Sequence, residues 1–333
     1  MESETLSLAE GEALIAAALV ASDVSPENAG HVARALVAAE ADGHKGHGFS
    51  RVAAYAAQAR SGKVDGHAVP EVSRPKPAFA LVDAKTGFAF PALSLAVGEL
   101  TGVARQLGIA AAAVRNSHHC GVLGHPVEAL AETGLIGLMV ANTPKAMAPW
   151  GGSAPLLGTN PIAFAAPETG APPLVIDLSL SVVARGRIMA ASKVGTPIPE
   201  DWALDADGNP TTDAAAALTG AMLPAAGAKG SALALMVEIL AGAIAGPHLS
   251  FQASSFFDAE GPSPSVGQFL IAIDPLSGGQ GVSGRVSSLL GAVAAEEGAR
   301  LPGLRRLEAR ASAARDGVTV PSVILGEIRA LAS

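Results

Sequence analysis

The chain has 333 residues, which is long for one hydrophobic core, so one composite domain or two to three lobes are expected. Hydrophobic residues make up 49% of it and charged residues 16%, enough apolar material to fill a large interior. With 22 basic against 30 acidic residues the formal net charge is -8, which argues against a nucleic-acid or anionic-membrane surface. A small-molecule partner fits these numbers better.

Cys120 is the single cysteine, so an intramolecular disulfide and a cysteine-based zinc site are both excluded. A reducing, cytoplasmic setting follows as the default. The N-terminus is acidic where a signal peptide would be basic, and the apolar stretch 230–246 is short and contains Glu238. We therefore expect no membrane partner. The low share of charged residues predicts a homodimer that covers apolar surface.

Hydrophobic periodicity predicts helices and strands that alternate along the chain. Two helices open it, with Ser7 and Ser25 as N-caps, and a third follows a glycine-dense loop at 43–48, with Ser50 as its N-cap. Residues 164–173 and 195–220 are predicted as loops. The alternation predicts the α/β class with a mixed sheet. The later elements are predicted as strands at 79–83, 109–116, 135–142, 174–183 and 268–273, and as helices at 91–107, 126–133, 229–245 and 282–297.

His47 and Arg51 stand where the glycine-dense loop meets the third helix. A histidine titrates near pH ~6.5 when unperturbed, which suits proton transfer to a substrate that accepts a hydride. An arginine four residues on suits a substrate carboxylate, because its planar fork makes two parallel charge-assisted hydrogen bonds. The simpler alternative is a histidine at a helix start beside a solvated arginine.

Other glycine- and histidine-rich stretches admit more than one interpretation. The group His118, His119, Cys120 and His125 suggests a metal, but no carboxylate is near in sequence until Glu128, so a metal site is the weaker hypothesis. A glycine-rich turn after a buried strand can instead seat phosphate or ribose oxygens. The segment 279–284 matches G-x-G-x-x-G, yet no second strand ending in an acid follows, which favours a flexible connection.

Several motifs together resemble the malate/L-lactate dehydrogenase family of NAD(P)-dependent oxidoreductases, which is separate from the Rossmann-type enzymes. They are Asn116-Ser117-His118-His119 with Gly121 and Gly124, Asn142-Thr143-Pro144, Pro149-Trp150-Gly151-Gly152 and Gly158-Thr159-Asn160-Pro161. The likeness runs from about residue 10 to 306. It implies a non-Rossmann cofactor-binding lobe and a helical lobe built from both chain ends. We place the helical lobe at residues 1–75 with about 300–333, and the cofactor- and substrate-binding core at 76–299.

The resemblance also implies roles for single residues. It makes His47 the proton donor, and assigns Arg51 and Thr159 to the substrate. The family has a serine before its histidine, where this chain has Gly46, so a hydrogen bond that the serine would give is absent or comes from elsewhere. The residues implied to contact the cofactor are His119, Cys120, Gly121, Asp177, Leu178, Ser179, Gly227, Ala228, Lys229 and Arg305.

More than one substrate is consistent with the sequence. Residues 87–97 and 229–240 look closest to the Δ1-piperideine-2-carboxylate/Δ1-pyrroline-2-carboxylate reductases of the family, which favours a 2-imino acid. Gly46 and Arg187 depart from the serine and acid that support the histidine in some of those reductases. A 2-hydroxy acid dehydrogenase of the malate or lactate type is the alternative, and a cofactor-binding relative with little turnover is another. The choice between NAD and NADP stays open.

Overall fold

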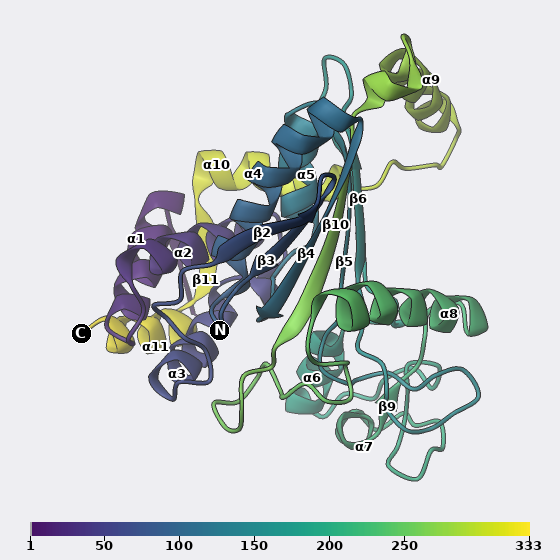
Figure 1. Ribbon diagram of the computed structural model, residues 1–333. Coiled ribbons are helices and arrows are strands. Elements are labelled where there is room, and N and C mark those ends of the chain that lie inside the picture. Colours follow the sequence, from purple (N-terminus) through teal and green to yellow (C-terminus); the bar gives the residue numbers. More distant parts are fainter. Residues whose placement is uncertain (1) are drawn as a thin grey trace.

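The computed structural model describes residues 2–333, and within them the centre is a seven-stranded sheet (Figure 1). Strands β3 and β4 run parallel, and the other neighbouring pairs are antiparallel. This confirms the predicted α/β class with a mixed sheet. In spatial order the strands are β2 (Glu71–Lys76), β3 (Phe79–Asp83), β4 (Ile109–Ser117), β10 (Val266–Ile273), β5 (Ile136–Ala141), β6 (Ile162–Ala166) and β7 (Leu174–Leu178).

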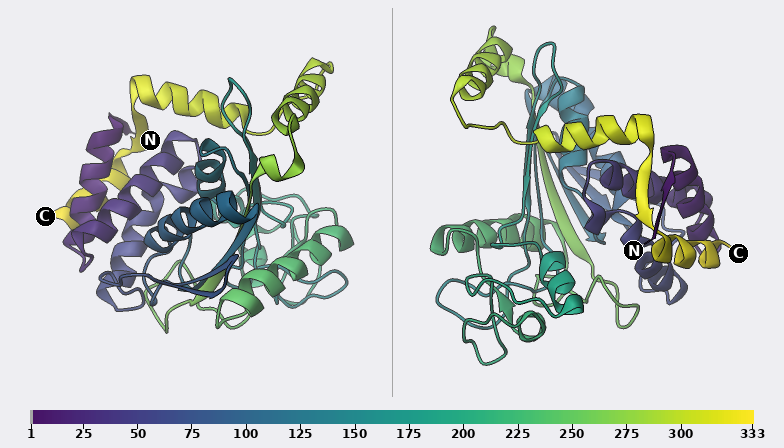
Figure 2. Two further views of the ribbon diagram at one scale, coloured as in Figure 1. Left: turned by 45° about the horizontal axis from the view of Figure 1, so that its top comes forward. Right: turned by 180° about the vertical axis from the view of Figure 1, so that it is seen from behind.

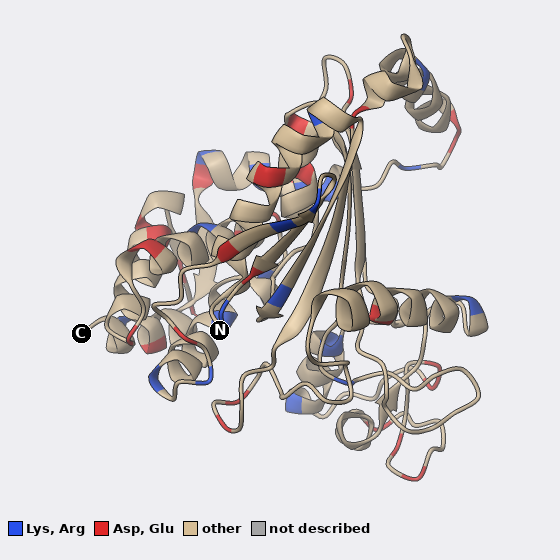
Figure 3. Ribbon diagram, viewed as in Figure 1, with Lys and Arg blue, Asp and Glu red and all other residues tan. Residues whose placement is uncertain are grey.

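One face of the sheet is covered by α4 (Ala89–Leu107) and α5 (Gly124–Glu132). Both helices bury large leucines in this core, among them Leu100 and Leu130. Each such side chain contributes about 1.5–3 kcal/mol when fully buried. The central strands of the sheet carry few charges, as expected for strands covered on two faces, whereas the exposed edge strand at residues 71–76 carries three (Figure 3).

The opposite face is covered by α8 (Ala228–Val237), which continues as the π-helix η3 (Glu238–Ala245). By length and composition this continuous stretch, Ala228–Ala245, is also the one helix in the described part of the chain that could cross a membrane. The same test is passed by core helices of soluble proteins, and here the helix packs on Val140 and Phe269 of the sheet.

A helical lobe stands beside the sheet and is built from both chain ends (Figure 2). Strand β1 (Ser3–Leu6) pairs antiparallel with β11 (Val318–Pro321), which brings the two ends together. This confirms the predicted architecture, whereas the domain boundaries given above stay predictions. The helices of the lobe are α1 (Leu8–Val20), α2 (Pro26–Ala41), α3 (Val52–Arg60), α10 (Leu304–Asp316) and α11 (Ser322–Ala332).

Two smaller parts complete the fold. Below the sheet in Figure 1, α6 (Arg185–Val194) and α7 (Ala214–Thr219) pack around the short pair β8 (Ala203–Leu204) and β9 (Ala221–Met222). At the other end, the 3-10 turn η4 (Pro275–Gly278) leads to α9 (Val282–Ala295), which projects away from the sheet (Figures 1 and 2).

Local signals in the sequence were right in some places and wrong in others. Ser7 and Ser25 do cap α1 and α2. Ser50 does not cap α3, because two 3-10 turns, η1 (Lys45–His47) and η2 (Phe49–Arg51), precede that helix and the Ser50 hydroxyl donates to the Lys45 carbonyl instead. The loop predicted from residue 164 is wrong at its start, since β6 extends to Ala166.

Candidate active site

His47 and Arg51 lie on the consecutive turns η1 and η2, directly before α3. A close approach to α2 fixes this path. A Cβ atom added to Gly48 would lie 2.1 Å from a carboxylate oxygen of Glu40, which itself accepts a hydrogen bond from the Phe49 backbone N–H at 3.2 Å. A side chain at position 48 would displace the Glu40 carboxylate, so glycine is favoured there, and the two turns are held against a buried side chain of α2.

The His47 ring stacks on the ring of His119, with 5.2 Å between centroids and 12° between planes. Burial, followed by the positive charge of nearby Arg51, lowers the pKa of His47 to about 3. His47 is therefore neutral near pH 7 until a substrate changes its surroundings. Its Nδ1 atom has no hydrogen-bond partner among the described residues.

Arg51 is held by its inner nitrogen and by one face. Its Nε donates to the Gly46 carbonyl at 2.8 Å, and its guanidinium carbon lies 4.7 Å from the centre of the Phe257 ring. The half-buried side chain thus presents its two terminal nitrogens as donors, the edge that matches a carboxylate in fork geometry.

Tyr55, one turn after Arg51 on α3, adds a third contact to this group. Its hydroxyl lies 2.5 Å from Nδ1 of His119. Burial raises the pKa of Tyr55, and burial lowers the pKa of His119 well below its usual value, so both groups are neutral near pH 7 and share one hydrogen bond. Tyr55 was not predicted from the sequence, although it lies four residues after Arg51, on the first turn of α3.

The turn after β4 contains His119, Cys120 and Gly121, three residues that the sequence assigns to the cofactor. Gly121 has a positive φ of 67°, and a Cβ atom there would approach Phe90 to 3.1 Å. Burial raises the pKa of Cys120 to about 12, so this buried side chain is a neutral thiol near pH 7. It shapes the turn without acting as a nucleophile.

The segment 177–181 adjoins the start of α5 and residues 158–161, which we call the threonine turn. The Asp177 carboxylate accepts from the Gly124 backbone N–H at 2.7 Å. The Thr159 carbonyl accepts from the Leu180 N–H at 2.9 Å and from the Ser179 hydroxyl at 3.4 Å. The predicted residues Asp177 and Ser179 thus contact the start of α5, three residues after Gly121, and Thr159.

The same segment also reaches the start of α8. The Ala225 N–H donates to the Leu180 carbonyl at 2.8 Å, and Gly227, Ala228 and Lys229 follow. Gly227 has a φ of 60°, and a Cβ atom there would lie 2.9 Å from the Trp150 ring. The Lys229 side chain is exposed. This helix start combines free backbone N–H groups with a cation, a common seat for phosphate.

Arg305 differs from the other predicted residues because it lies on the exposed side of α10. Its neighbour Arg306 points inward, where Nη1 donates to the Glu128 carboxylate at 2.6 Å. Arg310 joins Asp42 at 2.7 Å and Glu128 at 2.8 Å. These ion pairs connect α10 with α5 and with the end of α2. Arg305 was predicted from the sequence, whereas this network of ion pairs was not.

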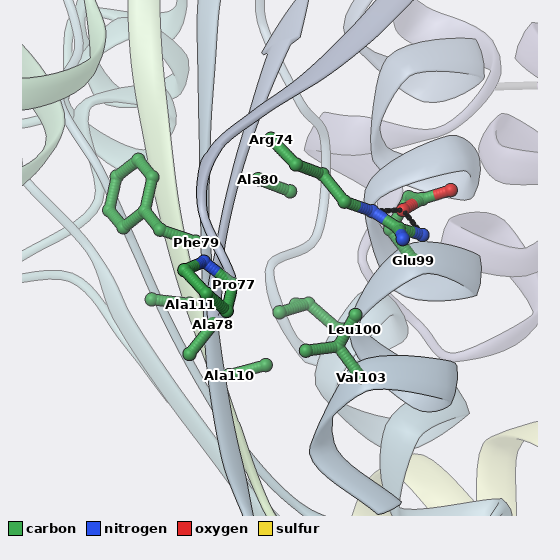
Figure 4. Close-up of a pocket in the computed structure, with 10 residues that line it drawn as sticks. All are labelled: Arg74, Pro77, Ala78, Phe79, Ala80, Glu99, Leu100, Val103, Ala110 and Ala111. Carbon is green, nitrogen blue, oxygen red and sulfur yellow. Dashed lines mark hydrogen bonds and ion pairs between the residues drawn. The ribbon is translucent and has the colours of Figure 1, made fainter. Parts of the chain in front are cut away.

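A narrow crevice between α4 and strands β2 to β4 is separate from these residues (Figure 4). Its lining is apolar apart from the ion pair of Arg74 with Glu99. His47 and Arg51 are not among the residues that line it. We assign no chemistry to this crevice.

The family model for malate/L-lactate dehydrogenase matches residues 6–329. The chain belongs to this family and is an NAD(P)-dependent oxidoreductase.

Among its curated relatives, the (2R)-3-sulfolactate dehydrogenase (NADP(+)) of Chromohalobacter salexigens is 50% identical over 99% of this chain and 98% of the relative. The Δ1-pyrroline-2-carboxylate/Δ1-piperideine-2-carboxylate reductase of Pseudomonas aeruginosa is 44% identical over 90% of this chain and 91% of the relative. The solved Δ1-piperideine-2-carboxylate reductase of Pseudomonas syringae pv. tomato superposes with a TM-score of 0.92 at 39% identity, covering 98% of this chain and 99% of that one.

Proposed function

We propose that this protein transfers a hydride from NAD(P)H to C2 of a small cyclic 2-imino acid, Δ1-piperideine-2-carboxylate or Δ1-pyrroline-2-carboxylate. The main support is the placement of His47 and Arg51 on consecutive turns, with the Arg51 side chain fixed by Gly46 and its terminal nitrogens directed outward. Reductases of these imines are among the relatives at 39–44% identity.

The residues present fit a dinucleotide. The Gly121 and Gly227 turns pack closely against the Phe90 and Trp150 rings, which fixes their backbone N–H groups, and Lys229 offers a cation at the start of α8. Phosphate oxygens suit such a helix start. When bound, the cofactor supplies the hydride. The polar residues Asp177 and Ser179 would hold the cofactor beside the threonine turn.

The two catalytic side chains act in a coupled way. Burial is the main cause of the low pKa of His47, and the positive charge of Arg51 adds to it; a substrate carboxylate bound to Arg51 offsets this second effect. His47 then takes up a proton more readily and gives it to the nitrogen or oxygen on C2. His119, oriented by Tyr55, supports the His47 ring from one face. Thr159 would contact the substrate from the opposite wall.

Three observations favour a second candidate, a 2-hydroxy acid dehydrogenase acting on a substrate such as 3-sulfolactate. The relative at 50% identity is named for that reaction. Gly46 also offers no hydroxyl to His47, and Arg187, which lies over the Trp202 ring at 5.0 Å, occupies the place of the acid in some imine reductases. An arginine suits a second anionic group on the substrate, such as a sulfonate.

The test is an absorbance assay of NADPH and NADH oxidation with four substrates side by side: Δ1-piperideine-2-carboxylate, 3-sulfopyruvate, pyruvate and oxaloacetate. We expect the cyclic imine to give the highest kcat/KM. A preference for 3-sulfopyruvate would support the second candidate. Tight cofactor binding without turnover of any of them would indicate a cofactor-binding relative with little activity.

Replacing His47 by Ala should reduce kcat by about 100-fold or more, because proton transfer by a positioned side chain contributes roughly 10²–10⁴-fold. The affinity for NADPH, measured by fluorescence titration, should stay within a factor of two. Equal activity of the variant and the wild type would contradict the assignment of His47 as the proton donor.

We further propose a homodimer, supported by large exposed apolar side chains on α8 and η3, among them Leu235, Ile239 and Ile244. Light scattering of the purified protein tests this. The cytoplasmic location also stays a prediction, made from the lone buried cysteine, Cys120.

A further inference from the structure

One loop crosses from the sheet to the helical lobe and passes over the candidate active site. We call residues 249–258, between η3 and β10, the strap. Its first anchor is Glu238 of the π-helix, whose carboxylate accepts from the Ser250 backbone N–H at 2.5 Å and from the Ser250 hydroxyl at 2.6 Å. Glu238 and Ser250 are both buried, so this end of the strap is fixed to the core.

The second anchor lies on the helical lobe. Gln58 of α3 donates through Nε2 to the carbonyls of Phe256, at 3.0 Å, and Asp258, at 2.9 Å. Lys63 donates to the Asp258 carbonyl at 3.1 Å and to its carboxylate at 2.9 Å. Gln58 and Lys63 are buried, with exposed fractions of 0% and 2%. The helix that follows Arg51 therefore carries the end of the strap.

Between the anchors the strap places two phenylalanines with different surroundings. Phe256 is buried, and its ring centre lies 5.3 Å from that of His118 and 5.2 Å from that of His119. Phe257 is 43% exposed, and its ring lies under the Arg51 guanidinium at 4.7 Å. Packing into a core explains the position of Phe256. It does not explain Phe257, whose ring, among the described residues, stacks with the Arg51 guanidinium and with no other aromatic ring.

We propose that Phe257 is a substrate-positioning residue, which holds the Arg51 guanidinium in the orientation that receives the substrate carboxylate. The proposal rests on the proposed function of Arg51. With Nε bonded to Gly46 and one face on Phe257, the guanidinium keeps its outer edge for the carboxylate. An aromatic face attracts a cation, and holding this long side chain in place beforehand lowers the entropy lost when a ligand binds.

Two substitutions separate the aromatic face from simple packing. Phe257→Leu keeps an apolar side chain but removes the ring, and Phe257→Tyr keeps the ring. Phe251→Leu is the matched control, because Phe251 lies on the same strap and is similarly exposed, at 49%. The probe is pyridine-2-carboxylate, a flat ring acid, titrated by calorimetry into the NADP(+)-loaded protein, with uncharged pyridine as the reference ligand.

We expect Phe257→Leu to weaken pyridine-2-carboxylate binding by roughly 3- to 30-fold, the range of a cation–π contact of about 0.7–2 kcal/mol. Phe257→Tyr and Phe251→Leu should stay within a factor of two of wild type. Pyridine and NADP(+) affinities should not change. In the assay, Phe257→Leu should raise KM for the imine more than it lowers kcat.

Equal carboxylate affinity of wild type and Phe257→Leu would overturn the proposal, and so would an equal loss in Phe257→Tyr, which would indicate packing. Failure of the wild-type protein to bind the carboxylate at all would also overturn it. A wild-type protein that binds the carboxylate but reduces no substrate would contradict the proposed function alone, since the binding series still reports on Phe257.

Discussion

Gly46 directly precedes His47, the candidate proton donor. At this position the family has a serine, so the chain departs here from the family pattern. A Cβ atom added there would meet open space, with no described atom within 4 Å, and its backbone is not in the left-handed region. A serine at this position is therefore accepted without strain. Its hydroxyl would stand one residue from His47, whose Nδ1 is buried without a partner among the described residues.

We expect Gly46→Ser to raise kcat for imine reduction by about 2- to 10-fold, because one added hydrogen bond contributes about 0.5–1.5 kcal/mol. Gly46→Ala is the control, since it adds the Cβ atom without the hydroxyl. Steady-state assays with Δ1-piperideine-2-carboxylate and 3-sulfopyruvate measure the effect on both candidate reactions. A gain that is the same in Gly46→Ala would show that the hydroxyl has no part in it.

His118 makes the stability depend on pH. It is fully buried, and burial lowers its pKa to about 3. The folded protein keeps it neutral between pH 6.5 and 3, whereas the unfolded chain binds a proton below about pH 6.5. Its contribution to stability is therefore fully present above pH 6.5 and is lost as the pH falls toward 3.

For this one histidine, the free energy of unfolding should fall by about 1.4 kcal/mol between pH 7.5 and 5.5. Urea denaturation at the two pH values measures it. His118→Leu, similar in volume and uncharged, should lose that part of the pH dependence, while carboxyl groups titrate mainly below this window. If the free energy of unfolding of the variant differs between the two pH values as much as that of the wild type, the assignment of this pH dependence to His118 would be contradicted.

At the scale of elements, short-range signals were sufficient where one local rule decides the structure. The capping residues Ser7 and Ser25 and the continuous apolar strand 109–116 are of this kind. The sequence could not reveal that β10, near the end of the chain, inserts between β4 and β5, because strand order depends on packing between distant segments. It also missed the ordered turns before α3, since tertiary contact with Glu40 decides them.

The same distinction separates the site residues that were predicted from the sequence from those that were not. His47, Arg51 and the glycine turns were predicted because family motifs mark them locally. Tyr55, Glu238 and the strap were not, because each acts through contacts between segments far apart in sequence. The Glu238 carboxylate accepts hydrogen bonds from Ser250 and from the Asn160 side chain at 2.9 Å, and so joins the strap to the threonine turn. A lone glutamate in an apolar helix gives no such sign in the sequence.

At the scale of the whole molecule, the helical lobe and the sheet are joined by a buried group of charges around Asp42 and Glu128. Asp42 is 4% exposed and Arg306 is 9% exposed. Hydrogen bonds from Arg310 and His125 hold the pKa of Asp42 below its usual value, against the effect of burial. The arginines come from α10, so the C-terminal part of the chain neutralises carboxylates that α2 and α5 bury.

Arg306→Met should therefore lower the free energy of unfolding by about 3 kcal/mol, because it leaves the buried Glu128 with Arg310 as its remaining cation. Arg305→Met is the matched control on the same turn of α10: an exposed side chain should change stability by less than about 0.5 kcal/mol. Urea denaturation at pH 7.5 compares the two. Fluorescence titration with NADPH on the same samples tests the predicted cofactor contact of Arg305, which would weaken binding in that variant without lowering stability. An Arg306→Met protein that unfolds at the wild-type urea midpoint would show that the ion pairs of α10 do not hold the lobe to the sheet.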